Sequence, residues 1–232
     1  MKKHIPNLIT LLNLAAGFVS IIFIINGEIL VAVWILMGAL LLDFLDGMAA
    51  RLMHAYSDLG KQLDSLADVV SFGVAPGLLM FIMIRDASGM EYASGYLPYI
   101  SVLIPVLSGL RLGIFNIDTE QAETFRGLPT PASAFFIFSL VLAGNYSDSN
   151  LIENLVSSRG ILLFFTLCFS FLMVTRIPMI SLKVKHIRLK GNELRLLFLG
   201  SSILLFALAG MASLPLIIII YIVVSVANAF TR

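Results

Sequence analysis

The sequence predicts an all-α integral membrane protein, a polytopic bundle with about eight membrane-spanning helices. The chain has 232 residues, of which 59% are hydrophobic and 12% are charged. A soluble domain is closer to about half apolar and about a quarter charged. The mean hydropathy is +0.99, and short polar segments separate apolar stretches long enough to cross a bilayer. No part of the chain has the composition of a separate soluble domain.

Eight apolar stretches approach the roughly 20 residues that a spanning helix needs. They cover residues 8–25, 29–50, 64–84, 96–115, 131–145, 160–180, 195–211 and 214–230. The polar connections between them include residues 51–63, 116–130, 146–159 and 181–194. Pro6 suits a helix start, and Asn7 or Thr10 could cap the first helix.

The distribution of lysine and arginine predicts the orientation, because cytoplasmic loops carry an excess of both. With the N-terminus inside, only Arg85 and Arg159 fall on the outer side. The other cationic residues fall on the inner side: Lys2, Lys3, Arg51, Lys61, Arg111, Arg126, Arg176, Lys183, Lys185, Arg188, Lys190, Arg195 and Arg232. This bias predicts an even number of spans and both termini in the cytoplasm. The expected location is the cell (inner) membrane, with the active site facing the cytoplasm.

Four aspartates lie at the cytoplasmic ends of the second and third predicted spans. Asp43 and Asp46 are three residues apart, and Asp64 and Asp68 are four apart. On a helix, both offsets place the two side chains on one face. A carboxylate at the membrane is costly unless it is compensated, so such residues indicate a functional site. Two acidic pairs on neighbouring helices could bind hard divalent cations through oxygen ligands.

Three interpretations of these acids compete. They could cap helix ends and pair with Arg51 and Lys61, or they could form the ion site of a divalent-cation transporter. Against the transporter, they lie at span ends and no broken helices are repeated in two halves. In the third interpretation, two cations clamp a diphosphate. The small residue Gly47 would let a head group approach closely, and Arg51 would bind phosphate oxygens.

The spacing of these residues resembles the signature of the CDP-alcohol phosphotransferases. The pattern is Asp43-x-x-Asp46-Gly47-x-x-Ala50-Arg51, then Gly60, Asp64 and Asp68 at fixed distances. Members of that family are membrane enzymes that transfer a phosphatidyl-type group from a CDP-linked lipid to an alcohol and release CMP. The resemblance implies two divalent cations, Mg²⁺ or Mn²⁺, and a homodimer. It also implies a six-helix core, here residues 1–180, followed by a basic loop and a C-terminal helix pair in residues 181–232.

The resemblance also implies a role for each matching residue. Asp43, Asp46, Asp64 and Asp68 would ligate the metals, and Asp68 would also be the catalytic base. The CDP-lipid would be contacted by Asn7, Thr10, Gly47, Arg51 and Ser57.

Motifs outside the signature resemble the phosphatidylserine synthase branch of the family. They are Asp64-Ser65-Leu66-Ala67-Asp68-Val69-Val70-Ser71-Phe72-Gly73, Arg111-Leu112-Gly113-Ile114-Phe115-Asn116 and Phe125-Arg126-Gly127-Leu128-Pro129-Thr130-Pro131. In the second motif, Gly113-Ile114 replaces the Ala-Arg of many relatives. This branch implies CDP-diacylglycerol and L-serine as substrates in the lipid bilayer, with no nucleic-acid partner.

Serine is a zwitterion, so its site needs a cation for the carboxylate. Arg111, Asn116, Arg126 and Thr130 are the predicted serine contacts, although Thr130 could instead cap a helix. Glycerol 3-phosphate or inositol phosphate is the alternative acceptor. Either would want more basic residues, whereas the 116–130 connection is net acidic.

Overall fold

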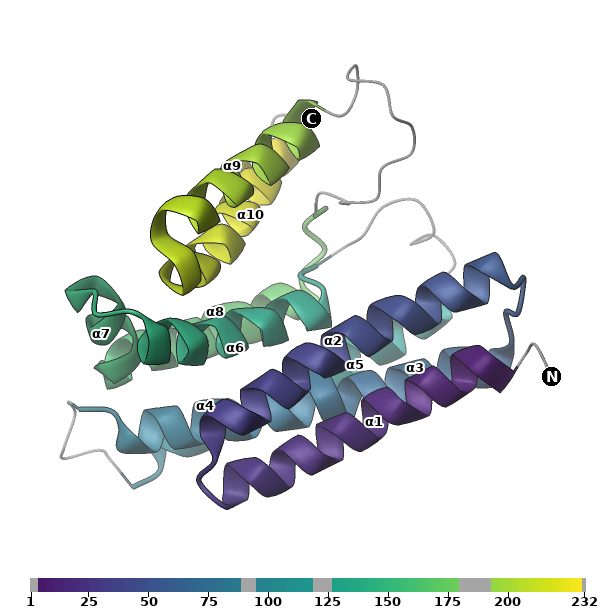
Figure 1. Cartoon of the computed structure of the whole chain (residues 1–232), viewed down its shortest axis with the longest axis horizontal. Coiled ribbons are helices and arrows are strands. Elements are labelled where there is room, and N and C mark those ends of the chain that lie inside the picture. Colours follow the sequence, from purple (N-terminus) through teal and green to yellow (C-terminus); the bar gives the residue numbers. More distant parts are fainter. Residues whose placement is uncertain (1–3, 89–94, 119–126, 180–192, 231–232) are drawn as a thin grey trace.

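The structure, a computed structural model, describes residues 4–88, 95–118, 127–179 and 193–230. Within these residues the chain is mainly helical, and an isolated β-bridge pairs Ser88 with Ser158. Figure 1 shows the arrangement of the helices. In chain order they are α1 (His4–Ile25), α2 (Ile29–Leu52), α3 (Asp58–Asp68), the π-helix η1 (Val69–Val74), α4 (Ala75–Asp86), the 3₁₀-helix η3 (Leu97–Val102), α5 (Leu103–Ile117), α6 (Thr130–Tyr146), α7 (Asn150–Ser157), α8 (Arg159–Val174), α9 (Glu193–Ala209), the 3₁₀-helix η5 (Gly210–Ala212) and α10 (Ser213–Phe230).

The predicted all-α class is confirmed, and each of the eight apolar stretches overlaps a helix, although α8 ends at Val174 and so covers only part of the predicted stretch 160–180. Five helical stretches in the described residues are long and apolar enough to cross a membrane: His4–Ile25, Ile29–Leu52, Asp58–Asp86, Leu97–Ile117 and Leu196–Ala229. The last stretch contains both α9 and α10, and α6 and α8 are shorter apolar helices. The predicted connection 146–159 contains a short helix, α7.

Two expectations about helix ends are also wrong. Asn7 and Thr10 lie inside α1 and do not cap it, since the described helix already begins at His4. Thr130 is the first residue of α6 and makes no side-chain cap, because its hydroxyl is bound to Arg111. Ser57 is a true N-cap: its Oγ accepts a hydrogen bond of 3.0 Å from the backbone N–H of Gly60 at the start of α3.

The helices α1 and α2 form a closely packed antiparallel pair joined by the short turn at Gly27 (Figure 1). Next to this pair, α3, η1 and α4 run as one continuous helical stretch, which packs on α1 on one side and on α5 on another. The antiparallel pair α9 and α10 packs on the rest of the bundle mainly through the contact of α10 with α6. The start of α1, the end of α2 and the start of α3 therefore lie at one end of the molecule.

A buried arginine fixes the opposite end. Arg159, the first residue of α8, is 8% exposed. Its guanidinium donates to the carbonyl oxygens of Ile84 (3.0 Å), Arg85 (3.3 Å) and Ala87 (2.6 Å). These carbonyls belong to the last turn of α4 and the residue after it, where a helix leaves carbonyls without intrahelical partners. Arg85 and Arg159, the two cations predicted for the outer side, thus lie together.

We expect Arg159→Ala to lower the free energy of unfolding by about 3 kcal/mol, because a charged donor is lost and buried carbonyls are left unpaired. Denaturation of the purified protein in detergent measures this change. Arg85→Ala is the matched control, since the Arg85 side chain is 56% exposed and, among the residues that the structure describes, forms an ion pair only with its neighbour Asp86. Equal losses of unfolding free energy in the two variants would show that Arg159 does not hold the end of α4.

Candidate active site

A cavity of about 680 Å³ opens at the end of the bundle where α2 ends and α3 begins. Side chains of α1, α2, α3 and α5 line it, together with Pro129 and Pro131 at the start of α6. Eleven residues that the sequence predicts for the site are among them: Asn7, Thr10, Asp43, Asp46, Gly47, Arg51, Ser57, Asp64, Asp68, Arg111 and Asn116. Thr130 lies between the two prolines, and Arg126 lies outside the described residues.

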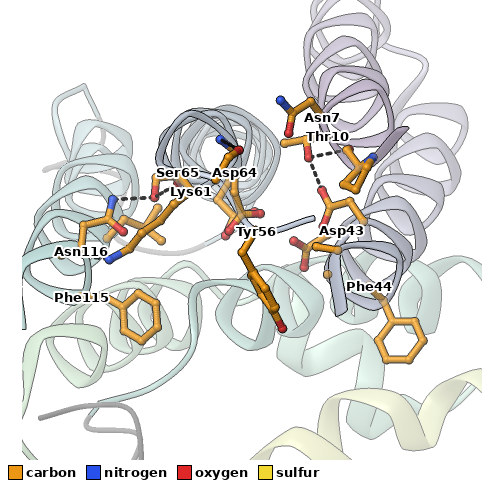
Figure 2. A pocket seen from close by; sticks show the side chains of 18 of the residues that line it. Asn7, Thr10, Asp43, Phe44, Tyr56, Lys61, Asp64, Ser65, Phe115 and Asn116 are labelled. Atoms are coloured by element: carbon orange, nitrogen blue, oxygen red, sulfur yellow. Dashed lines mark hydrogen bonds between the residues drawn. The ribbon is translucent and has the colours of Figure 1, made fainter. Parts of the chain in front are cut away.

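Three of the four aspartates, one from α2 and two from α3, converge at the cavity. Asp43, Asp64 and Asp68 each offer one carboxylate oxygen, and these three oxygens lie within 4.8 Å of one another. Figure 2 shows Asp43 and Asp64 on facing helices, directed into the opening between them. The offset of four residues puts Asp64 and Asp68 on the same face of α3, as the sequence predicts.

The fourth aspartate is held separately. Asp46 is 5% exposed, and its Oδ2 accepts a hydrogen bond of 2.6 Å from the hydroxyl of Thr10 on α1. The same hydroxyl lies 3.1 Å from the carbonyl oxygen of Pro6. This bond orients Asp46 toward α1, so the group of three oxygens does not include it.

The donor set suits a hard divalent cation. Three carboxylate oxygens at this separation repel one another unless a cation lies between them, and Mg²⁺ prefers oxygen ligands of this type. Within the described ranges, these three aspartates form no ion pair with a lysine or arginine. Oδ1 of Asp68 is buried and has no hydrogen-bond partner. The unpaired buried oxygen and the close acids together fit a metal centre.

Two glycines of the cavity wall, Gly60 and Gly47, leave room for neighbouring side chains. A Cβ placed on Gly60 would lie 3.0 Å from Oδ1 of Asn7 and 3.1 Å from Oγ of Ser57. A Cβ on Gly47 would meet only the guanidinium of Arg51, at 4.0 Å. Gly60 therefore lets the first turn of α3 pack against α1, and Gly47 leaves open space on the cavity wall beside an arginine.

The wall opposite α1 carries the remaining polar groups. Arg111 on α5 is 8% exposed, and its Nη1 donates to Oγ1 of Thr130 at 2.9 Å. Its Nε is buried and has no hydrogen-bond partner among the described residues. The amide of Asn116 donates to Oγ of Ser65 at 2.8 Å, which links α5 to α3 (Figure 2). A guanidinium with a free buried donor can bind a carboxylate.

Sequence reasoning missed several residues of this cavity. Nζ of Lys61 donates to the carbonyl oxygen of Asn116 at 2.8 Å and lies at the cavity wall. Its position three residues before Asp64 would place it on the same helix face. The sequence analysis assigned Lys61 to the connection 51–63 and so did not predict this. The other lining residues that were missed include Phe44, Tyr56, Ser65 and Phe115, all labelled in Figure 2.

The end of α8 holds the turn that leads into α6. The backbone N–H of Gly127 donates to the carbonyl oxygen of Ile177, and that of Leu128 to the carbonyl oxygen of Leu172, both at 2.9 Å. Gly127 has a φ of +74°, and a Cβ there would lie 2.5 Å from the carbonyl oxygen of Met173. Glycine is therefore required, and the turn fixes the position of Thr130 beside Arg111.

A helical bundle of apolar spans with an acidic cavity at one end defines an integral membrane protein with a metal-type site. The family model described as CDP-alcohol phosphatidyltransferase matches residues 3–172, which include every residue that lines the cavity. The chain belongs to the CDP-alcohol phosphatidyltransferase family.

Curated relatives within this family are similar over much of the chain. A CDP-diacylglycerol–serine O-phosphatidyltransferase of Helicobacter pylori is 32% identical over 197 residues, which cover 84% of this chain and 79% of the relative. A protein of the same name from Bacillus subtilis is 36% identical over 147 residues, covering 62% and 78%. An archaetidylserine synthase of Methanothermobacter thermautotrophicus is 37% identical over 153 residues, covering 62% and 60%.

Proposed function

We infer that this chain transfers the phosphatidyl group of CDP-diacylglycerol to the hydroxyl of L-serine, giving phosphatidylserine and CMP. The observation that carries this inference is one cavity with three converging carboxylates on one side and a buried guanidinium on the other. The first group suits a diphosphate and the second an amino-acid carboxylate. The names of the curated relatives give the same reaction class.

We propose that Asp68 is the general base. Its buried Oδ1 has no hydrogen-bond partner, so it is available to take the proton of the serine hydroxyl. The serine oxygen then forms a bond to the phosphorus that carries the diacylglycerol. The bond between that phosphorus and the CMP oxygen breaks, and CMP leaves with the electron pair. Arg51, on the last turn of α2, lies at the cavity wall where it can bind the departing phosphate.

Asp43, Asp64 and Asp68 would hold the divalent cations, with Asp46 as a further ligand from the same helix as Asp43. Two such ions, Mg²⁺ or Mn²⁺, would neutralise the diphosphate and the charge of the leaving group. The bond from Thr10 orients Asp46. Asn7, Gly47 and Ser57 line the same part of the cavity and are proposed to contact the CDP group.

The serine contacts are proposed for the opposite wall. Arg111 would bind the serine carboxylate through the donors that Thr130 leaves free, and Asn116 would face the small acceptor from the next turn of α5. Arg126, which lies outside the described residues, stays a proposed contact. A phosphorylated acceptor would need further cations, and Lys61 and Arg111 are the cationic residues that line this side of the cavity in the part of the chain described.

We further propose that the protein lies in the cell membrane with the cavity and both termini on the cytoplasmic side, and that it acts as a homodimer. Arg51, Lys61 and Arg111 line the cavity, whereas Arg85 and Arg159 lie at the opposite end. The cationic residues at the cavity support this orientation, because cytoplasmic ends carry more lysine and arginine. In this arrangement residues 1–180 form a six-helix core with the catalytic site, and residues 181–232 add a basic loop and the α9–α10 pair, for eight spans in total.

The test is CMP release by the purified protein in detergent, with CDP-diacylglycerol and Mn²⁺. We expect release that depends on L-serine and that EDTA abolishes. Release with glycerol 3-phosphate or inositol phosphate instead would keep the metal site and reject the serine assignment. Metal binding without any nucleotide-dependent reaction would favour a cation transporter and overturn the proposed function.

A further inference from the structure

One motif that the sequence singles out has no part in the chemistry above. Ser71, Phe72 and Gly73 follow Asp68 by three to five residues, yet none of them lines the cavity. All three are fully buried. They form the centre of η1, the π-helix that joins α3 to α4. Their role must therefore lie in how this turn is built.

The π-helix inserts one extra residue into an otherwise continuous helix. The backbone N–H of Ala75 donates to the carbonyl oxygen of Val70, five residues earlier. An α-helix would place that bond four residues apart, and each residue of an α-helix turns by about 100°. The extra residue therefore rotates α3, with Asp64 and Asp68, by about 100° relative to α4. Short π-helical segments of this kind are frequent at functional sites.

The helices α1 and α5 pack closely against η1 from two sides. On the α1 side, the hydroxyl of Ser71 donates to the carbonyl oxygen of Asn13 at 3.0 Å. A Cβ on Gly17 would overlap this hydroxyl and lie 3.0 Å from Cα of Ser71. On the α5 side, a Cβ on Gly73 would lie 3.1 Å from Oγ of Ser108. The helices thus approach as closely as glycine permits.

Contacts further along hold α4 in a fixed rotation. A Cβ on Gly77 would lie 2.8 Å from Cδ of Pro105, and the guanidinium of Arg159 binds the carbonyls at the end of α4. Since α4 is held against α5 and α8, a change of register within η1 must be taken up by α3. The side chains that would turn away are Asp64 and Asp68.

We propose that the π-helical turn Val69–Val74, held by the bond from Ser71 to the Asn13 carbonyl, is the element that aims Asp64 and Asp68 at Asp43. Ser71 is a positioning residue in this arrangement and touches no substrate. The inference rests on the proposed function, because it assigns the reason for the geometry of the same metal centre.

Deletion of Val70 tests the register directly. Removing one residue converts the π-turn into an α-helical turn and leaves Ser71, Phe72 and Gly73 in place. We expect the affinity for Mn²⁺, measured by electron paramagnetic resonance of the free ion, to fall at least tenfold. The control is Val69→Ala, which shortens a side chain of the same turn and keeps the residue count. It should keep the wild-type affinity, and equal Mn²⁺ affinity in the deletion and the wild type would overturn the proposal.

A pair of point variants decides the matter if the deletion variant does not fold. Ser71→Ala removes the bond to the Asn13 carbonyl and should weaken Mn²⁺ binding threefold or more. Ser108→Ala is matched to it: Ser108 is equally buried beside η1, but its hydroxyl has no hydrogen-bond partner. This control should keep the wild-type affinity, and equal affinities in the two variants would reject the positioning role.

Mn²⁺ binding and CMP release by the wild-type protein distinguish a failure of this inference from a failure of the proposed function. Serine-dependent CMP release with unchanged Mn²⁺ affinity in the Ser71 and deletion variants would overturn the inference alone. A wild-type protein that neither binds Mn²⁺ nor releases CMP would overturn the proposed function and the inference with it.

Discussion

Asp68→Asn is expected to lower turnover of serine and CDP-diacylglycerol by about 10³-fold or more, because an amide cannot accept the proton of the serine hydroxyl and general base catalysis is worth about 10²–10⁴-fold. The side chain keeps its volume and one oxygen, so binding of the CDP-lipid should change little. Single-turnover CMP release measures the chemical step, and equilibrium binding of the CDP-lipid to the same variant measures the substrate complex.

The control for this substitution is Asp86→Asn. Asp86 lies in the last turn of α4, at the end of the bundle opposite the cavity, and pairs with Arg85 on the surface. The same change from carboxylate to amide there should leave turnover at the wild-type level. Turnover by Asp68→Asn within a few-fold of wild type would reject Asp68 as the base. A loss of CDP-lipid binding as large as the loss of turnover would show that Asp68 acts chiefly in binding the CDP-lipid.

Much of the fold follows from local sequence. Hydropathy alone predicts the apolar helices, since a membrane span is a property of about 20 consecutive residues. Five helical stretches in the described residues are long and apolar enough to cross a membrane. The acidic spacing also places the site, because an offset of three or four residues sets a shared helix face wherever the helix lies. The sequence alone therefore allowed the prediction that Asp43, Asp64 and Asp68 belong to one site.

The features that sequence reasoning missed depend on partners far away in the chain. The π-turn has no signal of its own in Val69–Val74, since it depends on close approach to Gly17 on one side and to Ser108 on the other. Thr130 has the sequence signature of a cap but binds Arg111, 19 residues earlier. Asp46 has the same chemistry as Asp43, yet its bond to Thr10 on α1 sets it apart from the three converging acids. Such choices are made by tertiary contacts.

The second large effect on activity is expected from a substitution in the turn before α6, because this turn joins the end of α8 to the cavity wall that carries the proposed serine contacts. Gly127→Ala would place a methyl group 2.5 Å from the carbonyl oxygen of Met173 and 2.8 Å from that of Thr175, in a backbone conformation that alanine rarely adopts. The strain of a non-glycine residue at positive φ is about 1–3 kcal/mol, and the overlap adds to it. The turn must then withdraw from α8 and release the two backbone hydrogen bonds that hold it.

This withdrawal should separate Thr130 from Arg111. The loss of activity should therefore concern the use of L-serine and leave the use of CDP-diacylglycerol nearly unchanged. We expect kcat/KM for L-serine to fall by about 10²-fold, which corresponds to about 2.7 kcal/mol, while the KM for CDP-diacylglycerol changes by less than about threefold. Initial rates of CMP release at varied concentrations of each substrate measure the two effects. Gly113→Ala is the matched control, because Gly113 is an exposed helical residue of α5 with no atom near the position of an added Cβ. Equal losses for both substrates in Gly127→Ala would show that the turn supports the whole bundle, and its proposed link to the serine wall would be wrong.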